Sequence, residues 1–544
     1  MKEFISEEVF ARGPWNYFER SIARYFVHLG WDDVDYIGKT GDMGADLICT
    51  RNKKEYAVQV KYSVNNRPIT DDIVGDVVRA MKFYDINHGL CIANRKLGDA
   101  QKIKLQGYKN SGYDIQSLTS GKLLQSVKKL PEWIENPWPP RNYQHECIEK
   151  LKQSYELSDK RGLISLATGM GKTYVACSFI QWLYQNNKNL KILILAHQEE
   201  LLKQFDRSLW PFLPKWISTH ILTGDSKPNY DDGILLSTFE SFPNWYKNKD
   251  DISFDIVVVD EAHHSRARTY EEVINIVSPN YLLGLTATPY RTDGLSVTEI
   301  FGKPLVYYDV ARGIKQKFLS EVDYKLRCDN IKKDWIQNNS LKGYTIKQLN
   351  RKLFIEEREE EICDLIMNYW KNENRKRLVI FCQSIDHAEM IQNILIANYD
   401  LSCSSITNKV DKKENAKRLR KFRNGEIKAL TVYNMLNEGV DIPDIDFICF
   451  LRVTHSRTYF LQQLGRGLRY KKGKRLLVLD FVKDLRRIKA VKRQYSEFQE
   501  EGKEFMDLEN GFNLEFSNDF TDDFLKLVSE EIESEFLEEN QLIE

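Results

Sequence analysis

Short apolar strands alternate with helical stretches twice along this chain, and that alternation restricts the fold more than any other feature of the sequence. Helices between consecutive apolar strands are typical of a parallel sheet wrapped by helices. The pattern pauses through roughly residues 306–350, so the sequence predicts two α/β domains in tandem. The predicted strands are Leu163 to Ala167, Ile192 to Ala196, Ile234 to Ser237, Ile256 to Val259 and Tyr281 to Leu285 in the first domain, and Leu378 to Cys382, Ala429 to Tyr433, Phe447 to Leu451 and Leu476 to Leu479 in the second.

The first of these strands runs into a glycine-bearing turn, LATGMGKT, which is typical of a phosphate-binding loop. Gly169 and Gly171, with Thr168 beside them, let backbone N–H groups approach phosphate oxygens. Lys172 then supplies a cation to the terminal phosphates of ATP, and the Thr173 hydroxyl can ligate Mg²⁺ at the start of a helix. The strict pattern begins with a further glycine that this sequence lacks, so a structural glycine-rich turn is the alternative.

A later strand of the same domain ends in the sequence DEAH, which begins at Asp260. A strand tip of this kind offers one carboxylate, Asp260, to Mg²⁺ and another, Glu261, to polarise the attacking water. Alone, such a sequence more often starts a solvated helix, but downstream of a phosphate loop it indicates ATP hydrolysis. Gln144 starts the helix before the loop, where it could read an adenine edge, although glutamine at a helix start is more often only solvated.

The second α/β domain has no phosphate loop, so its contribution to ATP chemistry must come from side chains presented across a cleft. Arg466 and Arg469, in QQLGRGLR, are three residues apart, which predicts that both lie on one helical face. A cation delivered in this way to the γ-phosphate makes turnover depend on closure of the cleft. Nucleic acid bound across both domains can then control hydrolysis.

Two short strands near the N-terminus are predicted to form a hairpin with polar side chains on one face. The strands are Ala45 to Thr50 and Glu55 to Tyr62, joined by the polar turn Arg51 to Lys54. The register that pairs Thr50 with Glu55 brings the polar residues together. Gln59 then lies opposite Asp46, and Lys61 points to the same side as Gln59 because strand side chains alternate.

Asp46, Gln59 and Lys61 are the side chains that metal-assisted phosphodiester cleavage needs. A carboxylate and an amide oxygen are ligands for Mg²⁺ or Mn²⁺, and an ammonium orients water or neutralises developing charge. A lysine inside the apolar strand AVQVKY costs free energy unless it has a role or a route to water. The alternative is a polar, solvent-facing side of an edge hairpin. An amphipathic helix is predicted before the hairpin, from Pro14 to Leu29, with Glu19 beside its apolar stripe.

From about Phe10 to Leu118 the chain resembles the Mrr-type branch of the restriction-endonuclease-like nucleases. The resemblance rests on GDMGADLICT followed by AVQVKY, and it includes a later helix, Asp71 to Tyr84, and a strand, Gly89 to Ala93. It implies a restriction-endonuclease-like α/β domain whose catalytic core is Asp46, Gln59 and Lys61. In such a core Asp46 and Gln59 hold the metal, and Glu19 is an extra ligand. Gln59 stands where the wider superfamily more often has an acid.

From Arg141 to about Val482 the chain resembles superfamily 2 DEAH-box helicases, close to the motor subunits of type I and type III restriction enzymes. Besides the phosphate loop and DEAH, the resemblance rests on AHQEELLKQ, TATPYR, NEGVDIP and QQLGRGLR. It implies two tandem RecA-like domains, in which residues 286–288 couple hydrolysis to movement. It also implies that Asp441 lies near the nucleotide sugar and that Arg466 and Arg469 are arginine fingers.

We expect a nuclease domain at residues 1–125, a proline-rich connector at 126–140, RecA-like domains at 141–310 and 311–485, and a helical acidic extension at 486–544. The end of that extension is expected to be a solvated helix rather than a tail that docks a protein partner or mimics DNA. The 79 basic residues equal the 79 acidic ones, so any nucleic-acid surface must be local. Nine cysteines without a CxxC pair argue against zinc or iron–sulfur binding and indicate a reducing cytoplasm. No apolar run is long enough to predict a membrane span.

Together these patterns predict an ATP-dependent DNA helicase or translocase coupled to a metal-dependent DNA endonuclease. ATP and Mg²⁺ are the expected cofactors, and DNA is the expected partner. Restriction of foreign DNA is implied by the resemblance alone. The main alternative keeps the motor but makes the N-terminal block a DNA-binding module that does not cut, so that the protein remodels or senses nucleic acid. An RNA helicase is disfavoured because the N-terminal block resembles DNA nucleases.

Overall fold

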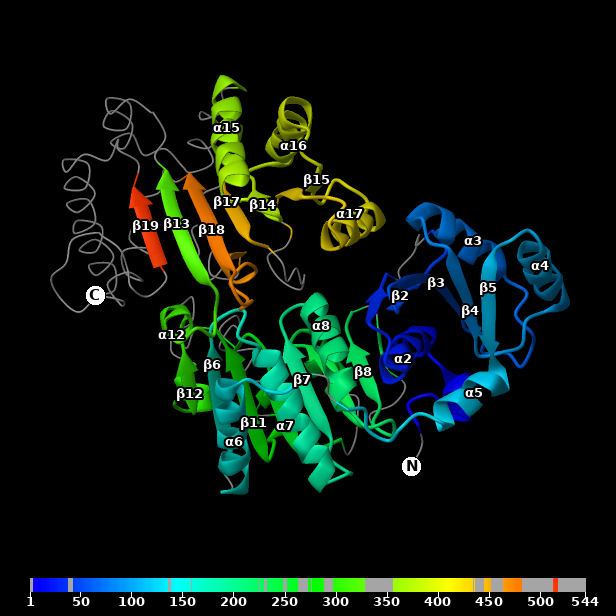
Figure 1. Cartoon of the computed structure of the whole chain (residues 1–544). Coiled ribbons are helices and arrows are strands. Elements are labelled where there is room, and N and C mark those ends of the chain that lie inside the picture. The colour runs from blue at the N-terminus through cyan, green and yellow to red at the C-terminus, as the bar shows by residue number, and fades with distance from the viewer. Residues whose placement is uncertain are drawn as a thin grey trace. The chain divides into compact units, whose positions relative to one another are not determined.

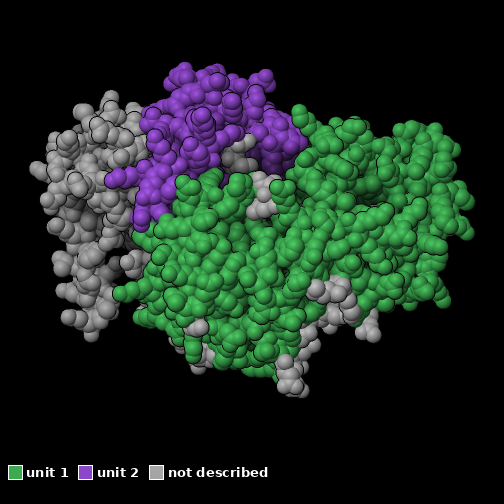
Figure 2. All heavy atoms as spheres, turned by 60° about the horizontal axis from the view of Figure 1, so that its bottom comes forward, with its two compact units in different colours: residues 1–166, 171–307 green, residues 167–170, 308–544 purple. Residues whose placement is uncertain are grey.

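The computed structural model describes residues 3–327, 356–481 and 512–516, apart from short gaps. The gaps are residues 38–42, 136–137, 158, 225, 229–231, 248–251, 263–272, 275, 288–296, 434, 436–444 and 452–462. The chain divides into two compact units, one of residues 1–166 and 171–307 and one of residues 167–170 and 308–544 (Figure 2). None of the described helices combines the length and apolar character that crossing a membrane requires.

The N-terminal part of the first unit is a five-stranded mixed sheet in the order β1-β2-β3-β4-β5, of which Figure 1 labels β2 to β5. Its strands are β1 Asp33–Tyr36, β2 Leu47–Arg51, β3 Lys54–Lys61, β4 His88–Ala93 and β5 Asp114–Thr119. The first three strands are antiparallel neighbours, whereas β4 and β5 run parallel to β3. Asn52 and Lys53 have positive φ angles of 51° and 63°, the backbone of a two-residue hairpin turn. The predicted four-residue turn is therefore only two residues long.

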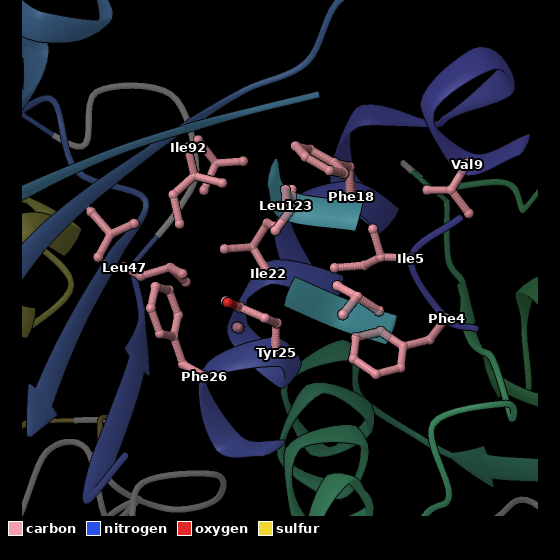
Figure 3. Packing of buried hydrophobic residues seen from close by; sticks show 14 of the residues in the cluster. Phe4, Ile5, Val9, Phe18, Ile22, Tyr25, Phe26, Leu47, Ile92 and Leu123 are labelled. Atoms are coloured by element: carbon pink, nitrogen blue, oxygen red, sulfur yellow. The ribbon is translucent and has the colours of Figure 1, made fainter. Parts of the chain in front are cut away.

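Helices cover both faces of this sheet. They are α1 Glu7–Arg12, α2 Trp15–His28, α3 Ile73–Tyr84, α4 Asp99–Asn110 and α5 Ser120–Lys128. On one face Ile22 and Phe26 of α2 pack with Leu47 of β2 and Leu123 of α5 (Figure 3). The other face packs against α3 and α4, and Ile48 of β2 belongs to that second core. Successive residues of one strand thus serve opposite cores, as the alternation of strand side chains requires.

The rest of the first unit contains a seven-stranded sheet in the order β12-β6-β11-β10-β7-β9-β8. Its strands are β6 Arg161–Leu166, β7 Ile192–Ala196, β8 Thr219–Leu222, β9 Ile234–Thr238, β10 Ile256–Val259, β11 Tyr281–Thr286 and β12 Val306–Tyr308. Its helices are α6 Asn142–Glu156, α7 Lys172–Asn186, α8 Glu199–Leu209, η1 Trp210–Phe212, α9 Ser241–Tyr246 and α11 Thr298–Phe301. The strands β6 to β11 pair in parallel. Strand β11 lies between β6 and β10, so the loops that follow β6 and β10 meet at one edge of the sheet.

The second unit is built on another seven-stranded sheet, in the order β15-β16-β14-β17-β18-β13-β19, and all its neighbours are parallel. Its strands are β13 Glu321–Arg327, β14 Leu378–Phe381, β15 Cys403–Ile406, β16 Ala429–Val432, β17 Phe447–Phe450, β18 Arg475–Phe481 and β19 Phe512–Phe516. Its helices are α12 Val310–Lys315, α15 Glu356–Asn372, α16 Ile385–Tyr399 and α17 Lys412–Asn424. Strands β14, β16 and β17 are buried along their whole length, which explains why their sequences are apolar apart from Thr431.

Helix α2 also joins the N-terminal domain to the parallel-sheet domain of the same unit. The buried guanidinium of Arg24 donates hydrogen bonds to the backbone oxygens of Pro214 and Ile217, at 2.8 and 2.6 Å. One turn earlier, Arg20 Nε lies 3.2 Å from an Asp206 carboxylate oxygen on α8. The apolar cluster around α2 includes a tryptophan of η1. The two domains of the first unit therefore share buried polar and apolar contacts.

The nine strands predicted for the two parallel sheets are confirmed, with ends that differ by two residues or fewer. The sequence does not predict β8 and β15, and it also misses β12 and β13, which lie where the alternating pattern was expected to pause. The extension at 486–544 is predicted to be helical, but its described part, β19, is a strand, so the prediction is wrong there. Apolar and polar residues alternate in FNLEF, as strand periodicity requires. The other residues of the extension lie outside the described part of the chain.

Candidate active sites

The predicted phosphate loop connects β6 to α7. Gly169 and Gly171 have φ angles of 91° and 83°, in the left-handed region that glycine adopts without strain. Helix α7 begins at Lys172, so Thr173 lies in its first turn, where backbone N–H groups and the helix dipole favour an anion. The hydroxyl oxygen of Thr168 is buried and has no hydrogen-bond partner among the described residues. Such a group fits a site that a polar ligand completes.

Lys172 of the phosphate loop and Glu261 of the DEAH segment face each other. The Lys172 ammonium lies 3.3 Å from a Glu261 carboxylate oxygen, and the side chains are only 8% and 14% exposed. Glu261 itself has a φ of 45°, which a residue with a side chain rarely adopts and which costs on the order of 1–3 kcal/mol. The structure thus brings the predicted cation and the predicted water-polarising carboxylate into one small, buried space.

Asp260, the predicted Mg²⁺ ligand, is buried next to Glu261. Its carboxylate accepts a hydrogen bond from the Glu261 backbone N–H at 3.0 Å. Burial, and after it the Glu261 charge, raise the pKa of Asp260 to about 7, whereas the nearby Lys172 ammonium acts in the opposite direction. Two buried neighbouring carboxylates are unfavourable unless cations balance them. This donor set fits a divalent cation that arrives with a nucleotide.

Gln144 lies against the same loop. Its side-chain oxygen accepts a hydrogen bond from the Arg141 backbone N–H at 2.9 Å and so caps α6. Its amide nitrogen would lie 2.6 Å from a Cβ added at Gly171, so that glycine leaves the space that the amide occupies. The side-chain oxygen of Gln144 is thus used in capping the helix. Its role in reading adenine stays a prediction.

Arg466 and Arg469 do not share a helical face, so that prediction is wrong. The helical residues end at Gly465, Arg466 lies in a turn, and Arg469 forms an isolated antiparallel bridge with Leu319. Glycine disfavours helix, and a Cβ added at Gly467 would lie 2.6 Å from a Leu476 methyl carbon. Close packing of the turn against β18 therefore selects glycine and ends the helix.

The segment that carries both arginines is held by the residues before β13. The Ser320 hydroxyl donates a hydrogen bond to the Arg469 backbone oxygen at 2.7 Å. This fixes the backbone at Arg469, while the roles of both side chains as arginine fingers stay predictions. Asp441, predicted near the nucleotide sugar, lies outside the described residues.

In the N-terminal domain, Asp46 and Gln59 are in direct contact. Strands β2 and β3 pair Thr50 with Glu55, which confirms the predicted register. The Gln59 amide nitrogen donates a hydrogen bond to an Asp46 carboxylate oxygen at 2.6 Å, and the Val60 backbone N–H donates to the same oxygen at 2.6 Å. Both side chains are buried, with 4% and 3% of their surface exposed. A buried carboxylate is thus anchored by two donors at one end of the hairpin.

The Gln59 side-chain oxygen supplies a test of whether this place fits a metal ion. That oxygen is buried and has no hydrogen-bond partner among the described residues. A buried acceptor without a donor is unfavourable, and a divalent ion that prefers oxygen ligands would satisfy it. Within the described part of the chain, no group of three or more His, Cys, Asp or Glu could hold a metal. A metal here would therefore rely on Asp46 and on the neutral oxygen of Gln59.

Lys61 lies at the end of β3 and pairs with a residue that the sequence does not predict. Its ammonium is 3.1 Å from an Asp76 carboxylate oxygen on α3. A Cβ added at Gly44, whose φ is 92°, would lie 2.1 Å from the Asp76 backbone oxygen, so only glycine allows α3 this close. The one sequence signal for Asp76 is an acid next to Gly75 inside the otherwise apolar start of α3.

Glu19 lies on α2, and the structure connects it to Tyr36 of β1. The Tyr36 hydroxyl donates a hydrogen bond to a Glu19 carboxylate oxygen at 2.8 Å. Burial raises the pKa of Tyr36 first, and the Glu19 charge and then the more distant Asp46 charge raise it further. These effects favour the neutral hydroxyl that donates to Glu19. The sequence does not predict this tyrosine.

Three protein families match separate parts of the chain. Residues 10–125 match Mrr_cat, described as a restriction endonuclease family. Residues 138–291 match ResIII, described as the res subunit of type III restriction enzymes. Residues 357–471 match Helicase_C, the conserved C-terminal domain of helicases.

Whole proteins similar to this chain have related names. It is 26% identical to the putative ATP-dependent helicase IRC3 of Saccharomyces cerevisiae, over 66% of this chain and 54% of that protein. It is 28% identical to the type I restriction enzyme EcoAI endonuclease subunit of Escherichia coli, over 63% of this chain and 46% of that protein. It is 25% identical to the DNA 3'-5' translocase XPB2 of Sulfurisphaera tokodaii, over 63% of this chain and 81% of that protein. The chain spans about half the length of the first two relatives.

One solved structure is similar over nearly the whole chain. The ATP-dependent Type ISP restriction-modification enzyme LlaBIII bound to DNA superposes with a TM-score of 0.54 at 15% identity. The match covers 95% of this chain and 41% of that protein. At this identity the similarity concerns the fold alone.

Proposed function

We propose that this chain, an enzyme in which a restriction endonuclease domain precedes two helicase domains, is an ATP-driven DNA translocase or helicase that cuts DNA. The biological role that we propose is restriction of foreign DNA. The names of the type I and type III restriction enzymes that it resembles support this role. The observation that carries the proposal is that one chain contains two separate buried polar pairs at the predicted sites. One is the Lys172–Glu261 ion pair, and the other is the hydrogen-bonded Asp46–Gln59 pair.

In the proposed ATP site, each residue has a separate task. Gly169 and Gly171 leave room for phosphate oxygens, and Lys172 balances the charge of the terminal phosphates. Glu261 is placed to orient the attacking water once a nucleotide separates it from Lys172. Arg466 stabilises the transferred phosphoryl group, so turnover requires that the second helicase domain take part.

In the proposed nuclease site, Asp46 and Gln59 would hold a Mg²⁺ or Mn²⁺ ion. The ion would supply positive charge beside the scissile phosphate and activate water. Lys61 neutralises charge on the phosphate, and Asp76 keeps the Lys61 ammonium from turning away. Glu19, held by Tyr36, adds a carboxylate at the same end of the sheet.

A second candidate function is a motor whose N-terminal domain binds DNA without cutting it. The specific observation in its favour is the neutral Gln59, which leaves Asp46 as the one carboxylate of the pair. A site with so little negative charge holds divalent ions weakly. The protein would then remodel or sense nucleic acid.

The experiment that tests the proposal incubates the purified chain with plasmid and linear DNA, with and without ATP, Mg²⁺, Mn²⁺ and a chelator. We expect DNA-stimulated ATP hydrolysis, and cleavage only with a divalent ion. Asp46→Ala and Lys61→Ala are each expected to eliminate cleavage and to keep DNA-stimulated hydrolysis, because the two sites lie in separate domains. Cleavage that survives the chelator or the loss of Lys61 would contradict the nuclease assignment. Wild type that hydrolyses ATP and never cuts would favour the second candidate.

We also propose a reducing, cytoplasmic compartment. The eight described cysteines are buried free thiols, which supports this placement. Whether the acidic residues after Asp519 dock a protein partner stays a proposal of the same kind, and they lie outside the described residues.

A further inference from the structure

An open and strongly basic pocket of about 830 Å³ lies in the second unit. Eight of its lining residues are lysine or arginine, two are acidic, and none belongs to the proposed ATP or nuclease sites. They lie just before β14, β16 and β17 and just before or at the start of β18, so the parallel sheet gathers them at the edge where these strands begin. In a chain of zero formal net charge, this is a local concentration of positive charge.

Arginine side chains form a fixed part of the pocket. Arg375 Nη1 donates hydrogen bonds to the backbone oxygens of Asp446 and Arg475, at 3.0 and 2.5 Å. Arg377 Nη2 donates to the Arg423 backbone oxygen at 2.8 Å. These bonds hold both guanidinium groups in place, so the positive field needs no rearrangement before a ligand arrives.

The two acidic residues are engaged in holding the pocket together. The Asp446 carboxylate accepts hydrogen bonds from the backbone N–H groups of Lys376 and Arg377, the shortest at 2.8 Å. Glu373 pairs with Arg375. Asp446 therefore ties the segment before β14 to the start of β17, and two carboxylates do not balance eight cations.

Exposed lysine side chains add further positive charge to the pocket. Lys428, Lys471 and Lys472 are exposed on the pocket. The last two lie in a tight turn that is closed by a hydrogen bond from Lys474 N to Lys471 O at 2.9 Å, and Gly473 permits the turn with a φ of 76°. Lysine is a compact, mobile charge that suits phosphate oxygens at varying positions.

We propose that this pocket binds the phosphate backbone of DNA, as a contact separate from the ATP and nuclease sites. This inference rests on the proposed action on DNA. Sites for small organic ligands are mostly apolar, whereas Trp370 is the one large apolar residue in this lining. A cluster of eight lysine and arginine side chains instead suits the repeating phosphates of a nucleic acid, and it can bind them without reading the bases.

The test replaces Lys428, Lys471 and Lys472 together with Gln in the full chain and measures binding of a linear DNA duplex at several salt concentrations. Each lost phosphate contact reduces the slope of log affinity against log salt by about 0.9. We expect the slope to fall by roughly 2–3 and affinity at low salt to fall at least about tenfold. The same three positions changed to Arg are expected to keep the slope, because the charge stays. ATP hydrolysis without DNA should be unchanged in both variants.

An unchanged slope in the Gln variant, while wild type binds the duplex, would overturn the pocket and leave the proposed function intact. A Gln variant that changes ATP hydrolysis in the absence of DNA, with an unchanged slope, would mean that the pocket holds part of this chain instead. Wild type that binds no DNA at any salt concentration would overturn both the pocket and the proposed function.

Discussion

Lys172, the cation of the predicted phosphate loop, is buried against a carboxylate. Its position in a turn suggests an exposed side chain, yet only 8% of it is exposed, because Glu261 lies against it. The ion pair balances the charge of the buried ammonium when no phosphate is bound. In the proposed ATP site a nucleotide would compete with Glu261 for the ammonium, and the same competition would release Glu261 to orient water.

Lys172→Ala is expected to abolish ATP hydrolysis, because it removes the cation from the terminal phosphates. Lys172→Met keeps most of the side-chain volume and separates the loss of charge from the loss of packing. Glu261→Gln should still bind ATP but turn it over poorly. Hydrolysis rate, nucleotide binding and thermal unfolding are measured for each variant. Lys188→Ala, at an exposed position after α7, is the control, and near-normal turnover in Lys172→Met would refute the phosphate-loop assignment.

Gln59→Glu is expected to weaken the N-terminal domain without metal and to tighten metal binding. It replaces a donor that lies 2.6 Å from the Asp46 carboxylate with a second carboxylate, so a charge-assisted hydrogen bond worth about 1.5–3 kcal/mol becomes a repulsion. Added negative charge also strengthens binding of hard divalent ions. Thermal unfolding with and without Mn²⁺ should show a lower melting temperature in the variant and a larger rise on adding metal. Equal rises in both proteins would argue against a metal at this pair.

The sequence predicts Asp46 and Gln59 as a pair because strand periodicity and hairpin register are local. It does not predict Asp76 and Tyr36, because their places depend on how α3 and β1 pack on the hairpin. Asp76 reaches Lys61 only since Gly44 lets the backbones approach. Contacts that depend on such packing leave at most a weak signal in the local sequence, such as the acid next to Gly75.

At the scale of secondary-structure elements, most buried parallel strands are predicted well. Of the missed strands, β8, β12, β15 and β19 lie at sheet edges, whereas β13 lies between β18 and β19. Strand β10 is a buried four-residue apolar run, so its sequence is unambiguous. Strand β15 has the sequence CSSI and lies at the edge of its sheet, so few apolar residues mark it. The prediction that one helix carries both Arg466 and Arg469 is wrong for another reason. The helix ends before them because the backbone at Gly467 packs tightly against Leu476. The expected domain boundaries stay predictions.

Arg466→Ala is expected to lower nucleic-acid-stimulated ATP turnover by on the order of 10³-fold while ATP binding changes little. The reason is that an arginine finger acts on charge that develops only in the transition state. Arg466 lies in a turn. The backbone three residues later is fixed by the hydrogen bond from the Ser320 hydroxyl to the Arg469 backbone oxygen, so the substitution should leave the fold intact. Steady-state turnover and nucleotide affinity are compared in the variant and in wild type. Equal losses in affinity and in rate would make Arg466 a ground-state contact instead.

At the scale of the whole molecule, His28 makes the first unit sensitive to acid. Burial, and next the Arg24 charge, lower the pKa of His28 from 6.5 to about 2. Between these values the unfolded chain binds a proton that the folded chain does not. The contribution of His28 to the free energy of unfolding is therefore constant above pH 6.5. As the pH decreases from 6.5, this contribution decreases by up to about 1.4 kcal/mol per pH unit.

His28→Asn is expected to reduce this loss between pH 6.5 and pH 5, where wild type should lose about 2 kcal/mol through His28. Chemical unfolding of the full chain at a series of pH values measures the effect. His145→Asn, at an exposed position of α6, is the matched control and should keep the wild-type dependence. A pH profile that is the same in all three proteins would show that His28 does not titrate on unfolding.

Helix α2 has one more consequence for the proposed function. Glu19 on this helix is proposed for the nuclease site, and the next residue, Arg20, contacts the neighbouring helicase domain. The proposed nuclease site would therefore move together with that helicase domain. The broken ends would then lie at a set offset from wherever translocation halts, so a map of those ends would record the stopping places of the protein rather than a sequence that the nuclease domain recognises.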